Sequence, residues 1–168
     1  VALGNHEFDN GAAELARRLR NLKADAVCAN YDFTGNPLEG LVKPYVIVRR
    51  AGKKIGIIGL LTDISRVVDR SLLGGLEYQE PAPVVNRYAD YLKNEKGCDL
   101  VICLSHLGYT SDKELVPQIR NVDAIVGGHS HTLLNKMQHV DDLDGKDVVI
   151  VQDWCWGMKA GNLKVSWE

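Results

Sequence analysis

The stretch DLVICLSH, residues 99–106, is a continuous apolar run that ends in a histidine. Such a run is typical of a strand that is buried on both faces of a sheet. Before it, residues 81–97 have helical spacing, with a proline first and a glycine last. After it, residues 111–119 predict a helix opened by a Ser-Asp cap, and residues 123–128 (DAIVGG) predict the next strand. This alternation indicates an α/β layered domain with a largely parallel central sheet.

The rest of the chain adds elements around this sheet. Residues 11–22 place leucines on one face and arginines on the other, which predicts an amphipathic helix, and residues 24–30 predict a buried strand. The runs PYVIVRR and KKIGIIGLL predict a hairpin that turns at Ala51-Gly52. Two late segments alternate and predict antiparallel strands: residues 147–154 (DVVIVQDW) and residues 162–168 (NLKVSWE). We therefore expect a mixed sheet with antiparallel edges.

The bulk composition narrows the class of protein. A chain of 168 residues is one domain long and buries a core without disulfides. Its net charge of −2 provides no basic field for nucleic acid, and no apolar stretch approaches the ~20 residues of a membrane span. The four cysteines have neither C-x-x-C nor zinc-ribbon spacing, and buried thiols are favoured for Cys28 and Cys103.

Histidines gather where the predicted strands end. Four of the five lie at the C-terminal tips of three predicted strands: His6, His106, His129 and His131. Open α/β sheets build their sites at this end of the strands. One histidine at a strand end is usually a loop residue, but four together favour a metal site, with Asn5 offering a carbonyl oxygen beside them. His139 lies in a polar hairpin region and is interpreted as a surface residue.

Three blocks, GNHEFD, LSHLG and GGHSHT, in this order and spacing, resemble the calcineurin-like metallophosphoesterases. Within them the sequence is most similar to the N-terminal catalytic domain of the 5'-nucleotidase branch. The similarity extends to VCANYDFTGNPL, KKIGIIGLLT and the ending IVQDWCWGMKAGNLKVSW, so it covers essentially the whole chain. The resemblance implies a layered α-β-β-α sandwich with mixed sheets.

The resemblance also implies a site for two divalent ions (Zn, Mn, Mg or Fe). Asn5, His106 and His129 match the ligands of one ion, and His131 matches a ligand of the other. His6 matches the catalytic histidine that acts on the phosphate, and Asp9 matches the carboxylate that orients it. The implied reaction is hydrolysis of nucleotide monophosphates by metal-activated water.

The sequence departs from this family at its start. Members begin with an Asp-x-His block and a Gly-Asp block, which supply an aspartate and a histidine to the first ion and the aspartate that bridges both ions. Neither block occurs here. We therefore expect residues 1–168 to be a single partial catalytic domain, truncated at the N-terminus, without the family's C-terminal nucleoside-binding domain. Such a chain is expected to be weakly active or inactive and to self-associate through an exposed sheet edge.

Other interpretations remain open at this point. The same metal core serves cyclic-nucleotide or sugar-phosphate hydrolases, and the chain could be a non-catalytic module that keeps a remnant of a metal site. Trp154 and Trp156 could stack a base, although packing in a core or interface is favoured. The resemblance implies a periplasmic or cell-surface location, because most relatives are exported.

Overall fold

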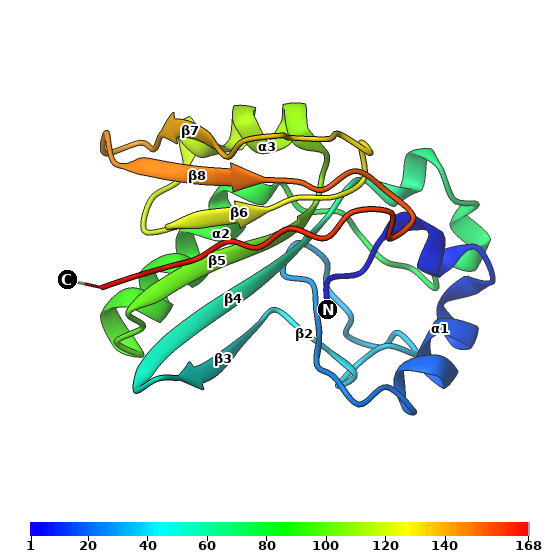
Figure 1. The fold of residues 1–168 in the computed structure, drawn as a ribbon. Coiled ribbons are helices and arrows are strands. Elements are labelled where there is room, and N and C mark those ends of the chain that lie inside the picture. Colours follow the sequence, from blue (N-terminus) through cyan, green and yellow to red (C-terminus); the bar gives the residue numbers. More distant parts are fainter. Residues whose placement is uncertain (168) are drawn as a thin grey trace.

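A six-stranded mixed sheet forms the centre of the computed structural model, which describes residues 1–167 (Figure 1). Its strands, in spatial order, are β3 (Tyr45–Arg50), β4 (Lys53–Leu61), β5 (Leu100–His106), β6 (Ala124–Val126), β8 (Asp147–Val151) and β7 (Gln138–Asp141). The pairs β4–β5, β5–β6 and β6–β8 are parallel, and the two outer pairs are antiparallel. The predicted mixed sheet with antiparallel edges is therefore confirmed.

The outer pair β3–β4 is the predicted hairpin. Its turn is Ala51-Gly52, with φ angles of 47° and 77°. Two consecutive positive φ angles are typical of the two-residue turns whose twist matches that of the strands they join.

Helices cover one face of this sheet. They are α2 (Pro81–Asp90), continued by a π-helical turn (Tyr91–Glu95), and α3 (Tyr109–Leu115), continued by a 3-10 turn (Val116–Gln118). Along β5, Val101 and Cys103 face these helices and are fully buried, whereas Ile102 and Leu104 face the other side and are half-buried. One face of the sheet is thus a closed core, and the other is partly open.

The segment after β8 passes over the open face of the sheet, and its course follows the direction of the strands (Figure 1). The Lys53 ammonium at the start of β4 lies 5.5 Å from the ring centroid of Trp167 near the chain end. The strand predicted for residues 162–168 is wrong for residues 162–167, which have no regular secondary structure, and Glu168 lies outside the described residues. The physical reason is that this segment passes over a face of the sheet and does not run beside the edge strands β3 and β7, so it has no strand to pair with (Figure 1).

A second, smaller core surrounds the N-terminal part of the chain. Here the structure has a 3-10 turn (Asn5–Phe8), α1 (Gly11–Leu19), and the parallel pair β1 (Ala26–Val27) and β2 (Val42–Lys43). Ala2 bridges Val27 in parallel, so the first residues lie beside β1. Two further 3-10 turns, Ile64–Arg66 and Arg70–Leu72, connect β4 to α2. The apolar residues of this core include Leu3, Phe8, Leu15, Leu38, Leu61 and Ile64.

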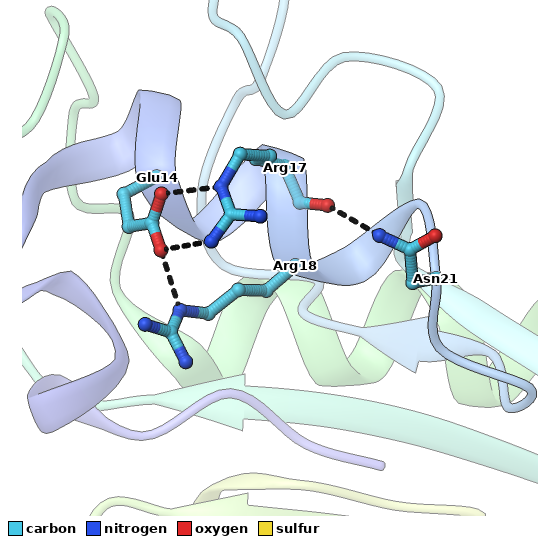
Figure 2. Close-up of polar contacts among 4 residues, drawn as sticks. All are labelled: Glu14, Arg17, Arg18 and Asn21. Carbon is cyan, nitrogen blue, oxygen red and sulfur yellow. Dashed lines mark hydrogen bonds and ion pairs between the residues drawn. The ribbon is translucent and has the colours of Figure 1, made fainter.

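The solvent face of α1 carries an ion-pair cluster (Figure 2). The Glu14 carboxylate accepts hydrogen bonds from Arg17 at 2.7 and 2.8 Å and from Arg18 at 2.8 Å. These two arginines lower the pKa of Glu14 to about 2, and Arg17 has the larger effect. Asn21 then donates to the carbonyl of Arg17 at 3.3 Å. The predicted amphipathic helix is confirmed for residues 11–19, with Leu15 and Leu19 turned to the smaller core; Leu22 lies beyond its end and is 42% exposed.

No helix among residues 1–167 is both long and apolar enough to cross a membrane.

The two cores meet at Gly59 of β4. A Cβ at this position would overlap the carbonyl group of Val27 in β1, so only glycine lets the two backbones approach. The Gly59 carbonyl also accepts a hydrogen bond from the amide of Ala29 at 2.8 Å. Gly59 therefore fixes the position of the N-terminal part against the large sheet.

Replacing Gly59 with alanine is expected to lower the free energy of unfolding by about 1–3 kcal/mol, because backbone must move to admit the methyl group. The matched control is Gly56→Ala on the same strand, where the new Cβ would lie 2.9 Å from Leu92 Cδ1, the far end of a flexible side chain. Urea denaturation of the two variants should show the smaller loss at Gly56. Equal losses would contradict the role given to Gly59.

Candidate metal and catalytic site

Three side chains from distant parts of the chain converge at the C-terminal end of the parallel strands. Asn5 Oδ1 lies 3.1 Å from His106 Nε2 and 3.2 Å from His129 Nδ1. The two imidazole rings are 5.1 Å apart between centroids, at an angle of 61°. Asn5 is buried and both histidines are half-buried. The structure therefore brings together the three residues predicted to share one ion.

The spacing of these three groups fits a divalent ion. Metal–nitrogen and metal–oxygen bonds are about 2.0–2.2 Å, so two ligands of one tetrahedral ion stand roughly 3.3 Å apart. The two separations from Asn5 Oδ1, 3.1 and 3.2 Å, match that value. An amide oxygen and two imidazole nitrogens are also donors that Zn²⁺, Mn²⁺ and Fe²⁺ accept.

Glycines let the backbone come close to the His106 ring. A Cβ on Gly4 would lie 2.9 Å from His106 Cε1, and a Cβ on Gly128 would lie 3.1 Å from His106 Nδ1. The amide of Gly4 donates to the carboxylate of Glu7 at 2.7 Å, which closes the turn that carries Asn5. Larger residues at either glycine would displace the ring.

The turn after β6 has an unusual backbone. His129 and His131 have φ angles of 68° and 52°, in the left-handed region that residues with a Cβ seldom adopt. Ser130 between them accepts a hydrogen bond from the amide of Tyr109 at 3.0 Å. Conformations of this kind persist where surrounding contacts impose them, and they concentrate at functional sites.

The pKa values of both half-buried histidines are lowered, which favours the neutral form. Burial lowers the pKa of His106, and the neighbouring His129 lowers it further. Burial likewise lowers the pKa of His129, with His131 and His6 acting in the same direction. A neutral imidazole keeps a lone pair, which is the form that binds a metal ion.

The predicted catalytic pair is formed and lies at the surface. His6 Nδ1 is 3.0 Å from Asp9 Oδ2, one 3-10 turn apart, and both side chains are mostly exposed. This contact fixes the orientation of the ring and leaves Nε2 free for another partner. An exposed imidazole beside a carboxylate is accessible to a molecule arriving from solvent.

Among the described residues, His131 makes no hydrogen bond to Asn5, His106 or His129, although it lies near enough to His129 to lower the pKa of that ring. It is exposed, and its recorded ring contact is with Trp156, at 5.8 Å between centroids and 66°. Trp156 itself is 80% exposed with a φ of 56°, so it does not pack in the core, and its packing in an interface stays a prediction. Within residues 1–167, no three His, Cys, Asp or Glu side chains are grouped so as to hold a metal ion; the convergent trio includes an asparagine.

The site rests on buried polar residues that the sequence analysis missed. Ser105 Oγ donates to Asp112 Oδ1 at 2.6 Å, and Gln152 Nε2 donates to Ser130 Oγ at 3.2 Å. The sequence predicted Asp112 as part of a helix cap, but α3 begins at Tyr109, and Asp112 is fully buried inside it. The sequence signal that could have identified this pair is its spacing. A serine lies directly before His106, and Asp112 follows that serine by seven residues.

The chain belongs to the calcineurin-like phosphoesterase family, whose model matches residues 1–133. It is 32% identical over its whole length to the snake venom 5'-nucleotidase of Naja atra, of which it covers 35%. The structure resembles that of a 5'-nucleotidase precursor from Thermus thermophilus, with a TM-score of 0.86, 37% identity and coverage of 93% of this chain and 33% of that one. It also resembles the NAD nucleotidase of Haemophilus influenzae, with a TM-score of 0.80, 30% identity and coverage of 91% and 33%.

These findings confirm the predicted family, its 5'-nucleotidase branch and the mixed α/β fold. The chain spans about a third of the length of the relatives it matches, 35% of the venom enzyme and 33% of the Thermus protein.

Asp112 makes stability depend on pH in a defined direction. Burial raises its pKa to about 6, although the hydrogen bond from Ser105 opposes the shift. Because the folded-state pKa lies above that of an unfolded aspartate, the contribution to stability is full below about pH 4 and is lost as the pH rises through about 6. Between pH 4 and pH 7 the native protein should lose about 2–3 kcal/mol of unfolding free energy relative to Asp112→Asn. Urea denaturation at both pH values measures this, and a constant difference would refute it.

Proposed function

We propose that this chain belongs to the catalytic domain of a 5'-nucleotidase-like phosphomonoesterase that depends on divalent metal ions. The observation that carries the proposal is the convergence of Asn5, His106 and His129 at ligand spacing. Family membership supports the phosphoester chemistry, and the names of the relatives support nucleotides as the substrate class.

Each residue has a role in this proposal. Asn5, His106 and His129 would hold one ion, and such an ion would supply a water of lowered pKa and positive charge to balance the phosphate. His6 lies over the phosphate and gives its proton to the oxygen that leaves with the nucleoside, as the P–O bond breaks and the oxygen of water attaches to phosphorus. Asp9 holds the His6 ring in a fixed orientation through Nδ1.

A second ion beside His131 follows from the family resemblance and completes the proposed centre. We propose that residues 1–168 form one domain, and that a separate domain of the complete enzyme binds the nucleoside. Three neutral donors hold a single ion weakly, so residues 1–168 alone are expected to hydrolyse phosphate esters slowly. A periplasmic or cell-surface location is proposed from the resemblance.

The test compares two histidines that each pair with an aspartate. In the complete product of the gene, with Mn²⁺ or Zn²⁺, AMP should release adenosine and inorganic phosphate, and a chelator should abolish this. His6→Gln should lower kcat by about 10²–10⁴-fold with metal content unchanged, because proton transfer is lost. The control is His139→Gln: His139 also contacts an aspartate, Asp147, at 2.7 Å, but on the exposed edge of β7 and β8. That variant should keep full activity.

The alternative functions give different outcomes in the same assay. Hydrolysis of cyclic nucleotides or sugar phosphates without AMP hydrolysis would replace the substrate class and keep the metal chemistry. Mn²⁺ binding without hydrolysis of any phosphate ester would favour a non-catalytic module. Unchanged kcat in His6→Gln would reject the role of His6.

The isolated chain is also proposed to self-associate. β3 is an edge strand whose backbone groups face solvent on one side, and Ile47 at its middle is 36% exposed. Edges of this kind pair with other chains, and lysine on an edge opposes such pairing. Light scattering should therefore show a mass that rises with concentration for residues 1–168, and a lower mass for Ile47→Lys. A monomer at all concentrations would contradict the proposal.

A further inference from the structure

Helix α3 contacts both turns that carry the candidate metal ligands. Its first amide, that of Tyr109, donates to Ser130 Oγ at 3.0 Å, between His129 and His131. One turn later its Asp112 accepts from Ser105 Oγ, the residue before His106. No other helix among residues 1–167 has recorded side-chain hydrogen bonds to both turns.

The contact with Ser105 fixes the backbone at the end of β5. Successive residues of a strand point to opposite faces, so Ser105 points to the helix side while His106 points to the open side. Ser105 Oγ, while donating to Asp112 at 2.6 Å, accepts a hydrogen bond from the amide of Leu107 at 3.1 Å. The peptide units on both sides of His106 are thereby tied to one buried carboxyl group.

The same carboxyl group lies against the second turn. A Cβ on Gly127 would stand 2.7 Å from Asp112 Oδ2, so this oxygen packs against the backbone two residues before His129. Asp112 is fully buried, and Oδ2 has no hydrogen-bond partner among the described residues. A carboxyl oxygen left unpaired in the core costs stability, and such a group is retained where another requirement outweighs that cost.

We infer that Asp112 is a positioning residue, which sets the distance between the His106 turn and the His129 turn from the far side of the sheet. Its Oδ1 holds the first turn through Ser105, and its Oδ2 spaces the second turn at Gly127. Asn5 Oδ1 meets both imidazoles only while this distance is kept. The inference rests on the proposed function only where it predicts a change in metal affinity.

The experiment uses four variants of the chain. Asp112→Ala removes both contacts, and Asp112→Asn keeps an acceptor for Ser105. Ser105→Ala breaks the same hydrogen bond from the other partner and decides the question if Asp112→Ala does not fold. Val116→Ala is the matched control, because Val116 is fully buried just after α3 and has an apolar side chain in the core.

Two measurements are made on each variant. The first is the position of the ring nitrogen resonances of His106 and His129 in the metal-free chain, which reports ring geometry without any assumption about function. The second is the dissociation constant of Mn²⁺ alone by calorimetry. Asp112→Ala and Ser105→Ala should shift both sets of resonances and weaken Mn²⁺ binding about tenfold, within the range for residues behind metal ligands. Asp112→Asn should stay within about threefold of the native value on the same reasoning.

A purely structural role predicts a different pattern. Val116→Ala should lose stability and leave both ring resonances and the Mn²⁺ affinity at their native values. Equal effects in Val116→Ala and Asp112→Ala, or unchanged resonances in Asp112→Ala and Ser105→Ala, would overturn the inference. Absence of Mn²⁺ binding by the native chain would count against the proposed function instead, and the ring resonances alone would then decide the role of Asp112.

Discussion

The parallel register of β5 with its neighbours is the constraint on which the site depends. Leu61 pairs with His106, and Leu104 pairs with Val126, so the ends of β4, β5 and β6 reach the same edge of the sheet. A parallel connection requires a crossover, which α2 and α3 supply on the closed face. The chain can therefore deliver two histidines from separate strands to one point. The N-terminal core then brings Asn5 to that point, because the apolar residues on either side of it are buried.

The electrostatics of the site favour a cation that itself attracts an anion. An amide oxygen and two neutral imidazoles bring no negative charge to balance a divalent ion. Burial favours neutral rings, since it lowers the pKa of both His106 and His129. An ion held in this way would retain most of its charge toward the open side. The His6–Asp9 pair is mostly exposed and therefore accessible from solvent.

Local sequence patterns predicted the elements well and their long-range partners less well. The hairpin at Ala51-Gly52 and the buried strand before His106 follow from turn chemistry and apolar runs, which act over a few residues. The segment at residues 162–167 alternates like a strand, but pairing depends on a free neighbouring edge, which the sequence does not reveal. Asp112 matched a cap pattern, yet burial beside Ser105 outweighs that local preference. For the site, strand-end position predicted the convergence of His106 and His129, while the directions of His129 and His131 depend on a backbone turn with positive φ.

In the turn that carries His129 and His131, the residues that would favour stability differ from the residues that could bind an ion. His129 and His131 occupy a region of backbone space that costs a residue with a side chain about 1–2 kcal/mol and costs glycine almost nothing. Glycine at either position would relieve the backbone and delete an imidazole. Selection for stability alone would thus replace the histidines with glycine. Only selection for the group that they bind would retain them. In a lineage that no longer needs the bound ion, replacing Gly-Gly-His-Ser-His with Gly-Gly-Gly-Ser-Gly would therefore raise the stability of the fold.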